Sequence, residues 1–445
     1  MKRMIAIAVL VLAFVVIAAA EEGARVISLN EAMEMALKNN TSLQASELNA
    51  ESTKWGYAQA ISGWMPKAYV KSGYTRLDDN SVNRANASYN KAKDLGVDTS
   101  NLRPSAYADT YQTSIVAVQP ITNGGAEWAA IKAGLSSKHE KDSERDLNKL
   151  TLKQSVEKAY YGVLQAQAML DVAKEADRLA DENLKLAQAK FELGQIAKAE
   201  LLRWQVNKAN SEGALVEAQN AYMIAKANLS ELIGIGMDER YDVEQLPEQI
   251  PQDTIDSMLN ELKNFQFSEE HPLMKQMSAT VDLAKSERLV AYSNALPSLN
   301  FTYTYSWETD NTIQLDGYES WTANVMLEIP IFQSGYGFFG IKKSYKSVAA
   351  AKSGYLESKR MLMLQTFSAK RNLEAAVKKL ETSQKGLESA RENIKLAQES
   401  YKVGLTSQLE LLDAQLAYQN ARSDVVNSVA GFLSAKADWE YVVGK

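Results

Sequence analysis

The sequence repeats itself at a fixed distance of 210 residues, and this duplication restricts the possible fold more than any other feature. The segment Glu182–Gln188 recurs as Glu392–Gln398, and 11 of the 24 residues in 182–205 are identical to those 210 positions later. The register holds without gaps from Pro120 to Ala227. A register of this length indicates two structurally similar copies within one chain of 445 residues.

The two copies differ in length between their first two strand-like segments. Upstream of Pro120 the distance between matching residues becomes 231, so the first copy holds 21 extra residues between Pro66 and Pro120. The extra stretch, around Asp78 to Asp109, is rich in Asn, Asp, Ser and Ala, which is typical of a solvent loop. We expect such a loop at a free end of the structure, because its flanks keep their register.

Each copy contains a long stretch without proline, 121–246 in the first copy and 331–445 in the second. Proline disrupts helix interiors, and Ala, Leu, Lys, Glu and Gln dominate both stretches, so we predict long helices over about 124–192 and 335–402. Each would be roughly 100 Å long, a length typical of a tube or rod.

A heptad stripe supports these helices, because a seven-residue apolar repeat is the pattern of a coiled-coil seam. The stripe has the same phase in both copies: Val163, Leu170, Asp177, Leu184 and Phe191 in the first, and Leu373, Leu380, Leu387, Ile394 and Tyr401 in the second. Each long helix ends near a glycine, Gly194 or Gly404, and a second helix follows over about 196–233 or 407–442. Ser407 and Glu410 have capping-box spacing at the start of the last helix. Each copy is therefore predicted to form a helical hairpin with its tip at the glycine.

Four segments alternate apolar and polar residues, which predicts strands with one apolar and one polar face. They lie at about 67–78, 109–120, 298–308 and 320–330. Strands of about ten residues cross a bilayer when tilted, and apolar-out, polar-in alternation with terminal Tyr and Trp is typical of a water-filled membrane barrel. The alternative is a half-buried sheet in a soluble protein. Four strands cannot close a barrel, so two chains would give eight strands and three would give twelve.

The first twenty residues have the pattern of a cleaved export signal. Lys2 and Arg3 precede an apolar run, which is too short to span a bilayer, and Ala18–Ala20 form a small-residue cleavage site. Removal of the signal takes two positive charges from a net charge of −6, so nucleic-acid binding is not expected. The mature chain is divided into a first repeat over 21–234, a linker over 235–270 and a second repeat over 271–445.

Composition also argues against an enzyme. The chain has no cysteine and two histidines, His139 and His271, so a thiolate site or a histidine-rich metal site has few candidate residues. No nucleophile–base pair, phosphate loop or metal-ligand cluster is evident in the sequence. We therefore predict no catalytic residues, no metal site and no cofactor. A soluble periplasmic coiled-coil scaffold, with the strands packed on its own helices, is the alternative to a membrane duct.

From about Ile27 to Lys445 the chain resembles the TolC family of outer-membrane efflux proteins. The resemblance rests on the duplicated order of elements, on the tip segments Phe191–Gly194 and Tyr401–Thr406, and on Leu411–Gln415. It implies a mainly α fold with membrane β-strands: a trimeric 12-stranded outer-membrane β-barrel continuous with a long periplasmic α-helical barrel. It also implies a homotrimer that contacts outer-membrane lipid, a periplasmic adaptor protein and an inner-membrane transporter. The function implied is a passive duct of a tripartite efflux or type I secretion system, whose cargo the sequence does not identify.

The resemblance further implies a gate at the periplasmic end of the tunnel. Glu410 and Asp413 match acidic residues that point into the narrowed tunnel, and their i, i+3 spacing puts both on one helix face. Three subunits would bring six carboxylates together, and such a ring repels itself and attracts cations. The plainer interpretation is a capping residue and a solvated acid.

Other residues match the gate lock and the tips. Tyr401 and Glu200 match a tyrosine and an acid that link neighbouring hairpins, although they could equally be a seam tyrosine and a surface acid. Thr406 stands where a well-known relative has a locking arginine. The residues matching the adaptor-contacting tips are Gly194, Val403, Gly404 and Leu405. Exposed apolar groups at a tip favour docking over a plain glycine cap.

Overall fold

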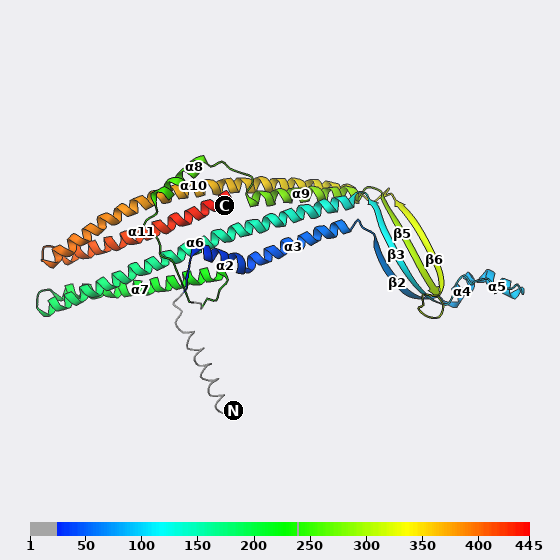
Figure 1. The fold of residues 1–445 in the computed structure, drawn as a ribbon, viewed down its shortest axis with the longest axis horizontal. Helices are drawn as coiled ribbons and strands as arrows, with labels where there is room; N and C mark the ends of the chain where they lie inside the picture. Colours follow the sequence, from blue (N-terminus) through cyan, green and yellow to red (C-terminus); the bar gives the residue numbers. More distant parts are fainter. Residues whose placement is uncertain (1–24, 238–239) are drawn as a thin grey trace, which may run out of the picture. The chain divides into compact units, whose positions relative to one another are not determined.

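A computed structural model of the chain describes residues 25–237 and 240–445 (Figure 1). The predicted export signal and its cleavage site lie outside the described residues. The helices are α2 (Leu29–Asn39), α3 (Thr41–Ser62), α4 (Asp79–Ala85), α5 (Ala87–Asp94), α6 (Ala126–Glu192), α7 (Lys198–Ile233), α8 (Gln252–Asn264), α9 (Pro272–Ser293), α10 (Tyr336–Lys402) and α11 (Gln408–Val443). The strands are β1 (Arg25–Ile27), β2 (Lys67–Arg76), β3 (Asp109–Asn123), β4 (Tyr241–Val243), β5 (Ser298–Thr309) and β6 (Tyr318–Glu328).

The helices confirm the internal duplication. α6 and α10 have 67 residues each, α7 and α11 have 36 residues each, and every one of their ends lies 210 residues from its counterpart. Both shorter helices end at a left-handed glycine, Gly234 with φ 72° and Gly444 with φ 80°. Glycine adopts this conformation at little cost, so the same residue ends the same helix in each copy.

The chain divides into two compact units. One, here called the hairpin unit, comprises the chain up to Asn49, Asp142–Lys275 and Leu356–Lys445. The other, the strand unit, comprises Ala50–Lys141 and Gln276–Tyr355. None of the helices in 25–237 and 240–445 combines the length and the apolar character needed to cross a membrane.

In the hairpin unit, α11 lies between α10 and α6, and α7 lies on the other side of α6 (Figure 1). Polar bonds join α6 to α11: Gln154 Nε2 donates to Asp438 Oδ1 at 2.8 Å, and Gln165 Nε2 donates to Asn427 Oδ1 at 2.7 Å. The helices therefore form a layer in the order α10, α11, α6, α7, with α10 and α7 at its edges.

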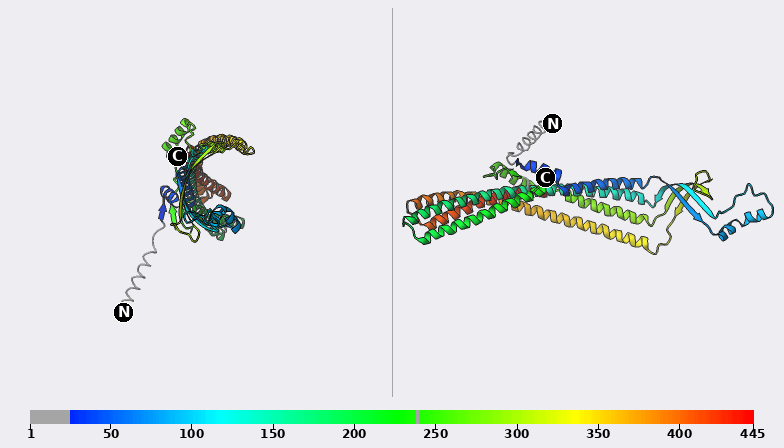
Figure 2. Two further views of the ribbon diagram at one scale, coloured as in Figure 1. Left: turned by 90° about the vertical axis from the view of Figure 1, so that its right-hand side faces the viewer. Right: turned by 90° about the horizontal axis from the view of Figure 1, so that it is seen from below.

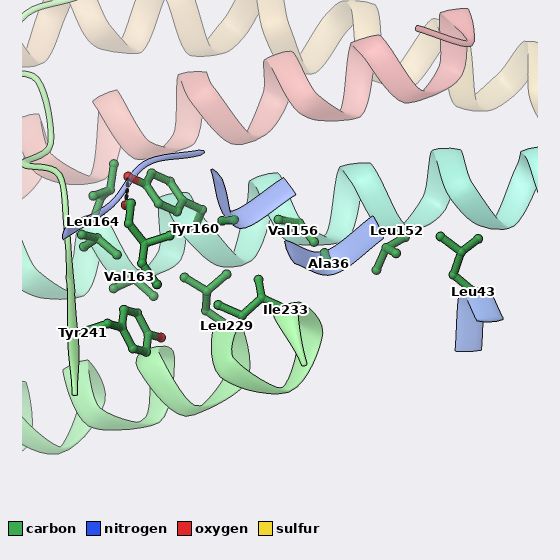
Figure 3. Close-up of a cluster of buried hydrophobic side chains, with 13 residues drawn as sticks. Ala36, Leu43, Leu152, Val156, Tyr160, Val163, Leu164, Leu229, Ile233 and Tyr241 are labelled. Atoms are coloured by element: carbon green, nitrogen blue, oxygen red, sulfur yellow. Dashed lines mark hydrogen bonds between the residues drawn. The ribbon is translucent and has the colours of Figure 1, made fainter. Parts of the chain in front are cut away.

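One buried core of this unit joins α2, α6 and α7 (Figure 3). Val156, Val163, Leu229 and Ile233 have no exposed side-chain surface, and burial of each contributes about 1.5–3 kcal/mol. The Tyr160 hydroxyl donates to the Ile27 carbonyl at 3.0 Å, next to the parallel pair β1–β4. This core fixes both ends of the first repeat on one long helix.

A second core joins α10, α11 and the linker helix α8. Phe432, Trp439 and Leu373 are fully buried in it, and Trp439 Nε1 donates to Glu261 Oε1 of α8 at 3.1 Å. The linker thus covers the second hairpin with the buried face of α8.

The predicted heptad stripe is mostly buried in the second copy, whereas in the first copy only Val163 and Leu170 are buried. Leu373, Leu380, Ile394 and Tyr401 are at most 8% exposed. Phe191, at the tip, is 38% exposed. Asp177 is the one charged residue of the stripe, and its carboxylate accepts from Lys208 Nζ at 2.7 Å and from Ser211 Oγ at 2.9 Å. A charged residue lies in this seam because a cation from α7 pairs with it.

The strand unit contains a four-stranded antiparallel sheet in the order β2-β3-β5-β6. The predicted strands lie within a few residues of the observed ones, with β3 extended to Asn123 across a register shift at Pro120/Thr122. β6 ends at Glu328, so Ile329 and Pro330 lie outside it. The two edge strands, β2 and β6, each have one side without a strand partner in the described chain.

The prediction of a solvent loop around Asp78 to Asp109 is wrong in part, because this insert contains α4 and α5 (Figure 2). Asp78 caps α4 by accepting from the backbone N–H groups of Asn80 and Ser81, both at 3.1 Å. The buried Asn86 side chain bonds the N–H and carbonyl of Ala106, which closes the insert at its base. The polar composition that suggested a loop supplies helix caps and turn bonds instead.

Candidate functional site: the hairpin tips

Both tips end their long helix with the same backbone turn. Gly194 and Gly404 have φ angles of 73° and 77°, and each is followed by a backbone bond that reaches back five residues. These bonds are Gln195 N–H to the Lys190 carbonyl at 2.9 Å and Leu405 N–H to the Ser400 carbonyl at 2.8 Å. This is the pattern of a Schellman motif, which satisfies the last carbonyls of the helix.

The tips expose large apolar side chains that this motif does not need. Leu193, Val403 and Leu405 are 73%, 70% and 82% exposed. A Schellman motif often adds an apolar contact between the residue after the glycine and the third residue from the helix end, but Leu405 has Ser400 as that partner. Helix termination therefore does not account for Leu405.

The start of α11 forms only half of the predicted capping box. Ser407 Oγ accepts from the Glu410 N–H at 3.3 Å, as a helix N-cap does. The return bond from the Glu410 carboxylate to the Ser407 N–H is replaced, because the Thr406 hydroxyl donates to Glu410 Oε2. Thr406, which stands where a relative has an arginine, thus holds the Glu410 carboxylate at the tip.

The structure brings Tyr401 and Glu200 together. The Tyr401 hydroxyl donates to Glu200 Oε1 at 3.3 Å, and Gln408 Nε2 donates to the Glu200 carbonyl at 3.1 Å. These two bonds connect the start of α7 to the end of α10 and the start of α11. Glu200 is thus bound to both helices of the second hairpin, α10 and α11.

A buried cluster surrounds this link. Ala187, Trp204, Ile394, Tyr401, Leu411 and Ala414 come from the four helices of both tips. Burial of Tyr401, and then the charge of Glu200, raises the pKa of the tyrosine hydroxyl, which therefore stays protonated and donates to the carboxylate. Lys190 Nζ lies 4.5 Å from the centre of the Tyr401 ring, so α6 also contacts this residue.

Glu410 and Asp413 lie on one exposed face of the first turns of α11. They are not joined to Tyr401 or Glu200 by any hydrogen bond within the described chain. In residues 25–237 and 240–445, no group of three or more His, Asp or Glu side chains is arranged to hold a metal ion. The functional groups of the tip are therefore the exposed carboxylates of Glu410 and Asp413 and the hydrogen bond between Tyr401 and Glu200.

The sequence analysis did not identify three residues that lie in or contact this cluster. Gln408 is buried although it follows the N-cap, and its role depends on the Glu200 carbonyl, 208 positions earlier. Trp204 is 1% exposed, and its Nε1 forms no well-aligned hydrogen bond with any of the described residues. Lys190 looks like any charged residue of a helix end. The duplication does not identify these residues either, because the other copy has a different residue at each position. Lys198 matches Gln408, Ala414 matches Trp204, and Ser400 matches Lys190.

Solved structures with the same fold are outer-membrane channels. The CmeC outer membrane channel of Campylobacter jejuni aligns over 94% of this chain and 85% of its own, with a TM-score of 0.78 and 17% identity. The outer membrane protein VceC of Vibrio cholerae aligns over 94% and 96%, with a TM-score of 0.78 and 14% identity. The open MtrE channel of Neisseria gonorrhoeae aligns over 94% and 88%, with a TM-score of 0.74 and 17% identity.

The sequence itself matches the outer membrane efflux protein family over residues 32–235 and 266–437, most of the chain and both repeats. No curated protein matches the sequence significantly. The family match confirms the TolC-like resemblance and places the function in transport across the outer membrane. The chain is a member of the outer membrane efflux protein family, a channel of the outer membrane that extends into the periplasm.

Proposed function

We propose that three copies of the chain form one duct that receives cargo from an inner-membrane transporter through a periplasmic adaptor. The observation that carries a barrel shared between copies is the sheet with two free edges, and the TolC-like resemblance favours three copies over two. In the order β2-β3-β5-β6 the strands alternate in direction, so β6 of one copy can pair antiparallel with β2 of the next. Twelve strands from three copies are enough to close a barrel.

The helix layer of the hairpin unit supports the same assembly. On α7 the exposed apolar side chains include Val206, Val216 and Met223, at 60%, 63% and 65%. On α10 they include Leu364 and Phe367, at 64% and 58%. Apolar side chains exposed at both edges of a layer favour closure by further copies over exposure to water.

The experiment for this proposal measures mass and conductance on the same detergent-purified protein. Light scattering should give three chains per particle, and the particle should form ion-conducting channels in planar bilayers. Paired Val216→Asp and Met223→Asp substitutions should shift the particle toward single chains, whereas Glu217→Gln on the same helix should not. A monomeric, non-conducting wild-type protein would contradict the duct and favour the periplasmic scaffold.

We infer that Glu410 and Asp413 line the gate of the duct. Threefold symmetry would place six carboxylates near the axis, where they attract cations. Glu410→Gln with Asp413→Asn should reduce cation preference in planar bilayers, while Glu217→Gln, an exposed acid away from the tip, should leave it unchanged. Equal selectivity of all three proteins would exclude these residues from the gate.

The link between Tyr401 and Glu200 is proposed to hold the closed state. Tyr401→Phe removes the hydroxyl donor and keeps the buried ring, so the open-channel fraction should rise without a large loss of stability. Tyr418→Phe on α11 is the matched control, because Tyr418 is partly buried in the same cluster. Identical single-channel behaviour of both variants and the wild type would rule out a locking role.

The exposed tip residues Val403 and Leu405, with Gly194 and Gly404, are proposed to dock the adaptor. Leu405→Ser should weaken cross-linking between the channel and its adaptor and reduce efflux in cells that carry both. Leu202→Ser, at a 48% exposed position on the side of α7, is the control for loss of an apolar surface residue. If efflux is unchanged when Leu405→Ser and Val403→Ser are combined, the second tip is not part of the docking surface.

A further inference from the structure

Exposed apolar residues continue beyond the end of the last strand in the strand unit. In β6, Val325 and Leu327 are 61% and 59% exposed. After the strand, the exposed side chains are larger and more exposed: Ile331 93%, Phe332 85%, Tyr336 70%, Phe338 60% and Phe339 66%. We call these five residues the junction patch. It begins where the membrane strand ends and reaches into the first turn of α10.

Positive charge follows the junction patch within two turns of α10. Lys342, Lys343 and Lys346 are all exposed. Lys342 Nζ lies over the Phe338 ring, 5.5 Å from its centre, so a lysine and an aromatic residue of this segment form a cation–π contact. Aromatic residues followed by lysines are the arrangement found where a protein passes from lipid to headgroups.

A groove of about 840 Å³ opens beside this segment, between α9 and α10. Small residues form much of its wall, including Ala284 and Ala291 of α9 and Gly340 of α10. Phe339 and Lys343 also line it, and Glu287 is its one carboxylate. A Cβ atom added to Gly340 would meet no atom within 4 Å, so space remains where a side chain would stand.

The matching part of the first copy shares only some of these features: Ile121 and Trp128 are exposed, and one of the three lysines is kept. At the five positions of the junction patch it carries Ile121, Thr122, Ala126, Trp128 and Ala129, and at the three lysine positions Lys132, Ala133 and Ser136. Ala129 is 2% exposed, and a Cβ atom on Gly134 would lie 3.3 Å from the Tyr57 Cα of α3. The corresponding helices α3 and α6 are therefore closely packed at this point.

We propose that the junction patch, the three lysines and the α9–α10 groove form a binding site for an anionic phospholipid of the outer membrane. One acyl chain would lie in the groove, beside Phe339 and Gly340. The phosphate would meet Lys343 and its neighbours, one turn further from the membrane strand. The volume of the groove lies within the range of small-ligand sites.

Charge favours a lipid over a second copy of the chain as the occupant. Lys343 and Glu287 both line the groove, and Lys342 and Lys346 are exposed on the same helix beside it. The segment therefore carries three positive charges against one carboxylate, so an anionic group is the complementary ligand. An interface between copies would favour apolar groups or paired charges at this place. A lipid also accounts for the order of the residues, apolar first and basic second, along the direction away from the membrane strand.

The site can be tested by native mass spectrometry of the detergent-purified oligomer with added lipid. Phosphatidylglycerol should remain bound, phosphatidylethanolamine should bind more weakly, and glycerol 3-phosphate should not compete because it has no acyl chain. Joint replacement of Lys342, Lys343 and Lys346 by Gln should lower phosphatidylglycerol affinity on the order of 100-fold, as each lysine near an anionic surface contributes about fivefold.

Gly340→Leu fills the groove without a clash and should also abolish retention of the lipid. Gly354→Leu is its matched control, since Gly354 lies on the same helix and likewise has no atom within 4 Å of an added Cβ. Equal binding of both phospholipids would overturn the anionic site. Retention unaffected by Gly340→Leu would overturn the groove, and loss of oligomer mass in the lysine variant with lipid retained would identify the surface as a contact between copies.

Discussion

The two short hairpin helices have the same length and the same glycine C-cap, yet they differ sharply in burial. α7 buries four residues, Trp204, Leu229, Ser230 and Ile233, whereas α11 buries thirteen. α11 packs against a long helix on each side, whereas α7 lies at an edge of the layer, where it packs against α6, against α2 at its end and against the second hairpin at its tip. Duplication therefore preserved the backbone of the hairpin, while position in the layer decided which side chains became core.

The seams of the hairpins differ as well. In the first copy Asp177 pairs with Lys208, and in the second copy Leu387 and Tyr418 occupy these positions. A paired polar group in a seam fixes the register of two helices, because any slip leaves a charge without its partner. The first hairpin is thus specified by polar pairing and the second by burial.

A third difference lies where the repeats begin. Asn40 caps α3 by accepting from the N–H groups of Ser42 and Leu43, and its Nδ2 donates to the Leu232 carbonyl of α7 at 3.3 Å. His271, 231 residues later, likewise caps a helix and bonds the end of a hairpin helix. Its Nδ1 accepts from Leu273 N–H at 3.2 Å, and its Nε2 donates to the Tyr441 carbonyl of α11 at 3.1 Å. The contact is titratable in the second copy only.

The largest expected effect contrasts the two short helices at matched positions. Phe432→Ala removes a fully buried ring from α11 and should lower the free energy of unfolding by about 3–5 kcal/mol. Tyr222→Ala, at the matching position of the less buried α7, should cost about 1 kcal/mol. Thermal unfolding by circular dichroism in detergent compares them. Equal losses would mean that α7 is as well packed as α11.

The seam comparison can be tested by transplanting residues. Asp177→Leu should lower the unfolding temperature, because it leaves Lys208 without its carboxylate. Adding Lys208→Tyr installs the pair of the second copy and should restore most of the loss. If the double variant is no more stable than Asp177→Leu, the two seams are not interchangeable and the double-mutant cycle measures no coupling.

His271 predicts a pH dependence confined to the second copy. Burial lowers the pKa of its imidazole, so the unfolded chain binds the proton more readily than the folded chain. The stabilising contribution is therefore complete above the ordinary histidine pKa of about 6.5 and is lost as the pH falls below it. His271→Asn copies Asn40 and should match the wild type at pH 7.5 but lose less stability between pH 7 and pH 5. If the unfolding free energies of His271→Asn and the wild type fall in parallel as the pH is lowered, His271 is not the source of the pH dependence.

The smallest expected effect concerns Trp204, which matches Ala414 in the second copy. Its buried Nε1 forms no well-aligned hydrogen bond within the described chain, although it interacts with the Tyr401 hydroxyl and lowers the pKa of that group, so Trp204→Phe removes only a weakly bound donor. The unfolding free energy should change by less than about 1 kcal/mol, since the smaller ring offsets the relief of the donor. A much larger loss would point to a partner for the indole N–H.

The duplication, the long helices and the strands could be predicted because each leaves a periodic trace in the sequence. The offset of 210 residues reappears in every end of α6, α7, α10 and α11. The helices of the insert could not be predicted from composition, because Asp78 and Asn86 are typical of turns and act there as caps. The short pair β1–β4 was not predicted either, since three residues per strand carry no detectable period.

The candidate site was predictable only in part. The resemblance supplied Tyr401 and Glu200, and the structure brings their side chains into contact. Gln408 and Lys190 could not be predicted, because each contacts a residue more than 200 positions away in the sequence: Gln408 bonds Glu200, and Lys190 contacts Tyr401. The roles of Glu410 and Asp413 stay predictions, since a ring of carboxylates requires neighbouring copies.

The insert with α4 and α5 has a consequence for symmetry. Two similar halves per chain, repeated three times, would give a ring with nearly sixfold symmetry. Since α4–α5 occurs only between β2 and β3 within the described chain, the rim of the proposed trimer would have three helical projections separated by three short loops. A rigid trivalent reagent spaced to the projections could bind all three at once, and avidity would then distinguish this rim from that of a channel without the insert.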